Sequence, residues 1–260
     1  MANFEVNELL KNMGIDFNVG KPNLKNIHEN ETGIIIANGP SLYTIPIDFL
    51  NKYPSIGMNN IYLYGMTDEE IAGYPHEHAD VKFVPDYYTI LGLDQLNTDA
   101  DLSYIKPILP HLKVMFCNRL LGPYLNYDNV YFIHTYSLLN HGRIRNTRQF
   151  SYDPLDRIGV GFTNTYVCAQ IMFWLGFSTV YIVGLDNDYF ADPEKKHFYL
   201  DDPRFCADIP RDGYRAMQLG SMYVMGLAKE AYHLAGRKLV NVNDVNNTPL
   251  DCVRFEDLEW

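Results

Sequence analysis

The sequence predicts an α/β fold in which a mostly parallel sheet is covered by helices. Two observations carry this prediction. Short apolar runs recur along the chain, and a polar residue follows most of them at once. A wholly apolar run such as residues 33–37 is typical of a strand buried on both faces, as in parallel sheets. Twice, a helical pattern stops at a glycine and leads into such a run, which is the alternation expected of an α/β protein.

The expected strands, in order, are residues 33–37, 55–58, 81–84, 113–116, 130–133, 179–183 and 238–242. The polar residues that follow them are Asn38, Asn59, Asp86, Asn118, His134, Asp186 and Asn243. In open parallel sheets, ligands bind beyond the carboxyl ends of the strands. Asn and Asp also end strands simply as turn formers. Each residue alone has that simpler explanation, whereas the collection at one edge favours a binding site.

Two helices are expected between these strands. The first covers residues 163–175, with Thr163 or Asn164 as its N-cap and Gly176 in a left-handed position after it. The second covers residues 214–235 and stops at Gly236. Residues 1–32 are expected to form a lead-in with a short helix near residues 7–13. Residues 33–260 are expected to form one domain, with a surface excursion at residues 86–110.

The amino-acid composition limits the classes of partner that the protein is expected to bind. Lys and Arg total 21 against 32 Asp and Glu, a net charge of −11. This balance opposes broad binding to nucleic acid or anionic membranes, but it leaves room for one phosphate pocket. The four cysteines form no CxxC pair, so free thiols are expected. The N-terminus has no signal-peptide pattern, and the longest nearly apolar stretch is about half a membrane span. We expect a cytoplasmic protein with at most peripheral membrane contact.

The sharpest motif is IIIANGPSLY, a buried strand that enters a Gly-Pro turn. Gly39 is expected to let a ligand approach the backbone, while Asn38 and Ser41 offer polar groups for a phosphate or ribose. The motif is neither a Walker loop nor a GxGxxG fingerprint.

The second motif surrounds the helix at residues 163–175. Its N-terminal amides, with Thr163 and Asn164, suit a phosphate. After the next strand, Asp186 and Asp188 form an Asp-x-Asp pair that is able to hold Mg²⁺ against a diphosphate, although such pairs are common by chance.

Two further groups have alternative explanations. His197, in the segment KKHFY, is a candidate general base or one more surface histidine. An arginine cluster suits a phosphate or carboxylate, and it serves equally as a solvated surface paired with acids. Its members are Arg143, Arg145, Arg148 and Arg157.

Taken together, five segments resemble a known bacterial family. They are ANGPSLYTI, GMNNIYLYG, TNTYVCAQIMFWLGFSTVYIVGLD, HFY and AGRKLVNVN. The chain resembles Rossmann-like proteins related to the MptE-like hydroxymethylpterin diphosphokinases and to the glycosyltransferase family 42 sialyltransferases. Many such proteins are associated with surface-polysaccharide or flagellar glycosylation. The resemblance covers roughly residues 33–243 and implies a three-layer Rossmann-like fold with helices on both faces of the sheet.

The resemblance also implies roles for single residues. His197 corresponds to the catalytic histidine that deprotonates the acceptor, and Tyr189 lies one position from a phosphate-binding tyrosine. The remaining implied nucleotide-binding residues are Asn38, Gly39, Ser41, Asn59, Asn60, Thr163, Asn164 and Asp186.

Three functions follow as hypotheses. The leading one is a glycosyltransferase with a nucleotide-sugar donor, a glycan or small-molecule acceptor and no required cofactor. The second is a pterin diphosphokinase in which Asp186 and Asp188 hold Mg²⁺ for ATP. The third is a non-catalytic nucleotide- or glycan-binding accessory protein. Each is compatible with a homo-oligomer.

Overall fold

A computed structural model gives the fold of the chain. It describes residues 18–74, 81–90, 105–118, 125, 127–136, 139–140, 143–144, 150–187, 197–199, 211–243 and 248–260. The expected helix near residues 7–13 lies outside these ranges. Among the helices in these ranges, none combines the length and apolarity that crossing a bilayer requires.

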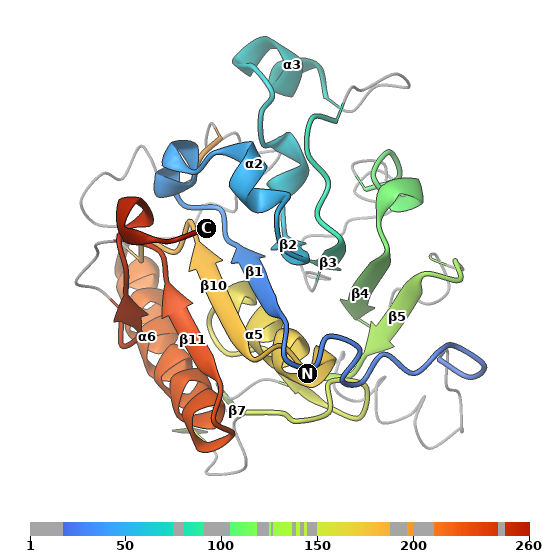
Figure 1. Cartoon of the computed structure of the whole chain (residues 1–260), viewed down its shortest axis with the longest axis vertical. Coiled ribbons are helices and arrows are strands. Elements are labelled where there is room, and N and C mark those ends of the chain that lie inside the picture. The colour runs from blue at the N-terminus through green and yellow to red at the C-terminus, as the bar shows by residue number, and fades with distance from the viewer. Residues whose placement is uncertain are drawn as a thin grey trace.

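The centre of the molecule is an eight-stranded sheet in which every neighbouring pair is parallel (Figure 1). Its strands, in sheet order, are β12 (Asp251–Cys252), β11 (Lys238–Asn241), β10 (Thr179–Val183), β1 (Thr32–Ile36), β2 (Ser55–Met58), β3 (Tyr87–Ile90), β4 (Val114–Asn118) and β5 (Val130–Ile133). The predicted parallel α/β fold is therefore confirmed.

The strand order reverses beside β1. The chain builds outward from β1 to β5, and then returns to place β10 on the other side of β1. Connections on the two sides of this point therefore diverge, which makes the carboxyl ends of β1 and β10 the topological switch point of the sheet. This is the place where open α/β sheets bind ligands.

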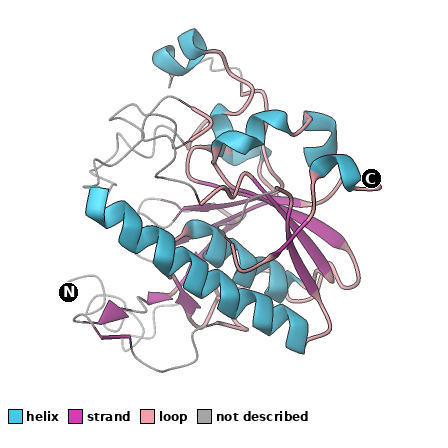
Figure 2. Cartoon of the chain, turned by 90° about the vertical axis from the view of Figure 1, so that its left-hand side faces the viewer, coloured by secondary structure: helices cyan, strands magenta, loops and turns pink. Residues whose placement is uncertain are grey.

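Helices of unequal size cover the two faces of the sheet. On one face, α5 (Asn164–Leu175) and α6 (Arg211–Leu234) pack against side chains such as Ile35 and Ile182. Figure 2 shows α6 as the outer of these two helices. The opposite face, which includes Ile34 and Ile36, packs on short helices. These are η1 (Pro40–Thr44), α2 (Ile47–Leu50), η2 (Ile61–Leu63) and η5 (Phe255–Asp257).

The smaller elements lie outside the main sheet. They are α3 (Asp68–Gly73), η3 (Leu109–His111) and two small two-stranded sheets. One sheet joins β6 (Thr135–Tyr136) to β9 (Ile158–Gly159), and the other joins β7 (Leu139–Asn140) to β8 (Arg143–Ile144).

Both ends of α5 are fixed as the sequence predicted. Thr163 is the N-cap, and its hydroxyl accepts a hydrogen bond from the Thr165 amide at 3.3 Å. Gly176 follows the helix with φ of +106°, a left-handed conformation that favours glycine. Inside the helix, the buried Gln170 side chain accepts from the amides of Ser151 and Gly159. The loop that leads to α5 is therefore fastened to the helix.

The lead-in packs along the sheet. The Asn18 side chain donates to the Phe132 carbonyl and accepts from the Phe132 amide, both at 2.8 Å, at the free edge of β5. The amides of Asn26 and His28 donate to Trp174 and Leu175, the last carbonyls of α5. Residues 18–31 thus supply hydrogen-bond partners to the edge of the sheet and to one helix end.

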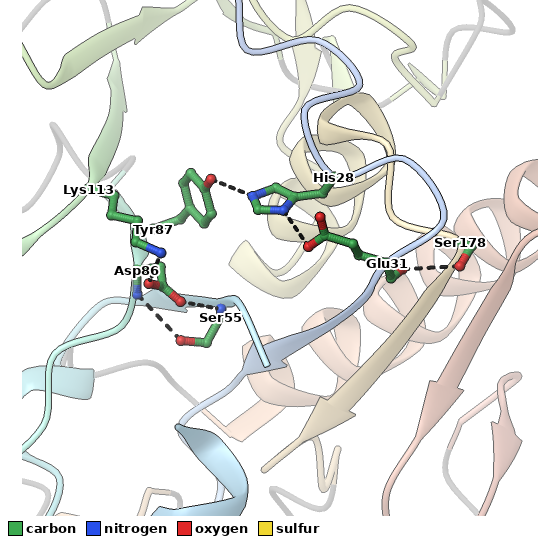
Figure 3. Close-up of polar contacts among 7 residues, drawn as sticks. All are labelled: His28, Glu31, Ser55, Asp86, Tyr87, Lys113 and Ser178. Carbon is green, nitrogen blue, oxygen red and sulfur yellow. Dashed lines mark hydrogen bonds and ion pairs between the residues drawn. The ribbon is translucent and has the colours of Figure 1, made fainter. Parts of the chain in front are cut away.

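One expected strand is wrong. Residues 81–84 form no strand, and β3 begins at Tyr87 instead. Asp86 therefore lies at the amino end of β3, away from the other candidate residues. There its carboxylate accepts from the Ser55 amide at 2.9 Å and pairs with Lys113 at 2.7 Å (Figure 3). The expected surface excursion at residues 86–110 begins, for the same reason, with a buried strand.

Three of the four cysteines lie in the described residues, and all three are free thiols, as expected. Cys117 and Cys168 are buried, whereas Cys252 is exposed. Burial raises the pKa of both buried thiols above the usual range, so they remain protonated at neutral pH. Cys206 lies outside the described residues.

Candidate functional site

The carboxyl ends of β1 and β10 are tied together by the turns that follow them. The Gly39 amide donates to the Gly184 carbonyl at 2.8 Å, which continues the pairing of the two strands. The Asp186 carboxylate accepts from the Ser41 amide at 2.9 Å and from the Asn243 side chain at 2.6 Å. Asp186 therefore joins the ends of three strands, β1, β10 and β11.

The close approach at Gly39 is made by the protein itself. A Cβ atom on Gly39 would lie 2.5 Å from an Asp186 carboxylate oxygen and 2.6 Å from the Gly184 carbonyl oxygen. Real Cβ atoms do not come this close to other atoms, so only glycine fits. The expectation was that Gly39 admits a ligand to the backbone, but on this side of the glycine the space is filled by the β10 turn.

Two buried polar atoms after β1 find no hydrogen-bond partner in the described part of the chain. Asn38 is 7% exposed; its Nδ2 donates to the Met58 carbonyl at 3.2 Å, but its Oδ1 has no partner there. The buried Oγ of Ser41 has none either. A buried polar group without a partner costs about 1–3 kcal/mol. Such atoms at the switch point are suited to meet a polar ligand.

The N-terminus of α5 lies beside the end of β2. The Asn164 side chain donates to the Asn59 side chain, and the Tyr88 hydroxyl donates to the Asn59 carbonyl. Asn59 has φ of +49°, a conformation that asparagine adopts more readily than most residues. Asn60 accepts from the Tyr62 hydroxyl at 2.9 Å. The structure thus brings the predicted residues of β2 and α5 into direct contact.

His197 is anchored to the same edge through its neighbour. The Phe198 amide donates to the Asn38 carbonyl at 2.9 Å, although 160 residues separate the two in the sequence. The half-buried His197 ring stacks on Tyr199, with ring centroids 4.9 Å apart and planes inclined by 7°. The predicted histidine therefore lies one residue from a direct contact with the turn after β1.

One polar residue at this edge is missing from the sequence prediction. Thr89 in β3 is fully buried, and its hydroxyl has no hydrogen-bond partner among the described residues. It pairs in register with Met58 and Phe116, whose side chains pack on the α5 side of the sheet. The misplaced strand at residues 81–84 concealed it. A Tyr-Tyr-Thr-Ile run, rich in β-forming residues, was the available signal.

Several predicted residues remain apart from this site or outside the described residues. Tyr189, Asp188, Arg145 and Arg148 lie outside the described residues. Arg143 belongs to the small strand β8, and Arg157 is exposed before β9. Within the described ranges, no three His, Cys, Asp or Glu side chains gather closely enough to hold a metal ion.

A cavity of about 250 Å³ lies near the start of β11. It is lined by Lys229, His233, Arg237 and Lys238, among others. Lys229 already pairs with Asp251 at 2.7 Å, and Arg237 donates to the Phe173 carbonyl at the end of α5. Lys229 and Arg237 thus have structural partners, and the cavity is distinct from the carboxyl edge.

Comparison with known proteins gives little beyond the fold. No family model matches the chain, and no curated protein matches it in sequence. Among solved structures, it is similar to the sialyltransferase CstII from Campylobacter jejuni, solved in complex with a substrate analogue, cytidine-5'-monophosphate. The TM-score is 0.47 and the identity 11%, over 89% of this chain and 88% of that chain. The expected relation to pterin diphosphokinases gains no support, and the chemistry rests on the site itself.

Proposed function

We propose that the chain is a glycosyltransferase-like enzyme that takes a nucleotide-sugar donor at the carboxyl ends of β1 and β10. One observation carries the proposal. Buried oxygens of Asn38 and Ser41, which have no partner among the described residues, lie at the switch point of the sheet, and the segment that bears His197 is hydrogen-bonded to the same turn. A polar ligand at this place satisfies the buried oxygens and lies near a titratable imidazole.

The proposed nucleotide is bound mainly by neutral groups. The N-terminus of α5, with Thr163 and Asn164, suits a phosphate, because a helix N-terminus carries a partial positive charge. The Asn59 side chain lies against Asn164 and extends this polar surface toward β2. A site of this kind reconciles one anionic ligand with a net charge of −11.

The proposed reaction is transfer to a hydroxyl acceptor. The His197 imidazole takes the acceptor proton while the acceptor oxygen bonds to the anomeric carbon of the donor sugar. The bond from that carbon to the phosphate oxygen breaks, and the nucleotide leaves with the bonding electron pair. His197 is half-buried, and its ring stacks on Tyr199 in the segment that is hydrogen-bonded to the turn after β1.

The diphosphokinase alternative has no observation in its favour. Both oxygens of the Asp186 carboxylate are already hydrogen-bonded within the protein, to Ser41 and Asn243. A metal ion at Asp186 would have to share these oxygens with the contacts that join three strand ends.

A thermal-shift series tests donor binding first. The nucleotides are CMP, CDP, UDP, GDP and ATP, each with and without Mg²⁺. We expect one pyrimidine or guanine nucleotide to raise the melting temperature without Mg²⁺, because ligands that bind only the folded state stabilise it. Stabilisation by ATP alone, and only with Mg²⁺, would contradict the proposal and favour a kinase.

His197→Ala then tests catalysis. With the sugar donor of the selected nucleotide, nucleotide release should fall about 100-fold or more, because general-base catalysis contributes about 10²–10⁴. The thermal shift with nucleotide should remain. His111→Ala, in η3, is the matched control and should retain activity. Full activity of the His197 variant would exclude it as the base, and binding without any turnover in the unmodified chain would identify an accessory protein.

A further inference from the structure

The outer face of α6 carries three apolar side chains with a large exposed fraction. Leu219, Tyr223 and Leu234 are 60%, 45% and 73% exposed. They follow one line along the helix, and the half-buried Leu227 lies between them on the same line. The opposite face of α6 is used for the core, where Val224 and Tyr232 are fully buried against α5. Single exposed apolar residues are ordinary, but a row of them indicates a contact surface on α6, which is the outer of the two helices on this face of the sheet (Figure 2).

We propose that this face of α6 binds a second copy of the chain, with the two α6 helices antiparallel about a twofold axis near Tyr223. A twofold contact requires a surface that complements itself. The two exposed charges beside the apolar row, Arg215 and Glu230, meet this requirement. They lie on the same flank of the row, and the midpoint between them falls between Met222 and Tyr223.

The charges select the antiparallel arrangement. When the helices run in opposite directions about that midpoint, Arg215 faces the partner's Glu230, and Glu230 faces the partner's Arg215. A parallel pair would place like charges together. This local balance matters because the chain carries a net charge of −11, which opposes the association of two copies.

A glycine supports the same arrangement. Gly226 lies on the outer face, and a Cβ atom there would meet only Pro249, at 3.8 Å. Packing within the chain therefore does not require glycine at this position. In the antiparallel pair, Gly226 lies opposite the partner's Leu219, so the missing side chain leaves space for the leucine.

Sedimentation velocity between about 1 and 100 μM tests the proposal. We expect a species of twice the chain mass of 30.0 kDa. Arg215→Glu and Glu230→Arg should each weaken the dimer about tenfold or more, because each change creates two repulsive pairs in a symmetric contact. The double variant should restore the dimer. A monomer throughout this range, or single variants that dimerise as well as the parent chain, would overturn the proposal.

Substitutions on the apolar face of α6 provide a second test. Leu219→Ser and Gly226→Leu should both weaken the dimer without lowering the melting temperature of the monomer, because both positions face outward. Val19→Ser is the matched control, since Val19 is 78% exposed on a different surface. A dimer that survives both α6 changes, or that is lost equally with Val19→Ser, would place the contact elsewhere and exclude α6. None of these outcomes depends on the proposed enzymatic function.

Discussion

Gly39 is the residue at which the turns after β1 and β10 come closest. The Gly39→Ala change would press a methyl group against Asp186 and the Gly184 carbonyl. Overpacking of this kind costs about 1–3 kcal/mol. We expect the free energy of unfolding in urea to fall by that amount and the nucleotide-dependent thermal shift to shrink. Gly73→Ala is the control, because nothing lies within 4 Å of a Cβ there; equal losses for both variants would contradict this account.

Asp186 has a structural role that a metal-binding interpretation would miss. In Asp186→Asn, an amide replaces one carboxylate oxygen that accepts from Ser41 or Asn243. Hydrogen bonds to charged groups contribute about 1.5–3 kcal/mol. The melting temperature should therefore fall to the same extent with and without Mg²⁺. A loss that appears only with Mg²⁺ would instead identify a metal ligand, and Asp128→Asn on the surface should change neither measurement.

At the scale of elements, α5 serves both the core and the proposed site. Thr163→Ala removes the hydroxyl that accepts from the Thr165 amide, and N-cap losses of this kind cost about 1 kcal/mol. We expect urea denaturation to show that loss and the nucleotide thermal shift to weaken with it. Thr163→Ser keeps the hydroxyl and should restore both. A Ser variant as unstable as the Ala variant would show that the methyl group, not the cap, matters.

The elements also show which sequence signals were sufficient. Residues 55–58, 130–133 and 179–183 were predicted to the residue, because each is an apolar run bounded by turn formers. The N-cap of α5 and the glycine that ends it were also predicted, because both signals lie in the residues at the helix ends. The β3 strand was missed because Val81–Val84 has a similar pattern and ends at proline. The position of β3 is set by its pairing with β2 and β4. The pattern of apolar residues along the sequence carries no information about that pairing.

The candidate site was predictable to a similar extent. The residues after β1, β2 and β10 were found because a parallel sheet must bring its carboxyl ends to one edge. The contact between Phe198 and Asn38, and the use of both Asp186 oxygens within the protein, depend on how distant loops fold back. No pattern in the sequence specifies either one.

For the whole molecule, buried tyrosines set the behaviour at high pH. Burial, followed by the carboxylates of Asp86 and Glu31, raises the pKa of Tyr87 to about 12. The unfolded chain loses this proton near pH 10, whereas the folded chain retains it. Stability from this group is therefore complete below pH 10 and falls as the pH rises toward 12.

The Tyr87→Phe variant tests this behaviour. Its urea stability should fall less steeply between pH 10 and 12 than that of the parent chain. Tyr127→Phe should leave the slope unchanged, because Tyr127 is 47% exposed. Identical slopes for the parent chain and Tyr87→Phe would contradict a raised pKa. At neutral pH, Tyr87→Phe should also cost some stability, because the hydroxyl lies 2.6 Å from His28 Nε2 (Figure 3).

The side chain of Asn18 has a consequence for solubility. Its amide meets the backbone of Phe132 as a neighbouring strand would, so the outer edge of β5 is occupied at that residue. The opposite edge is β12, only two residues long. Exposed strand edges serve as templates on which other chains polymerise, and short or covered edges prevent this. One asparagine, 114 residues away in the sequence, thus occupies backbone groups with which a strand of another molecule would pair.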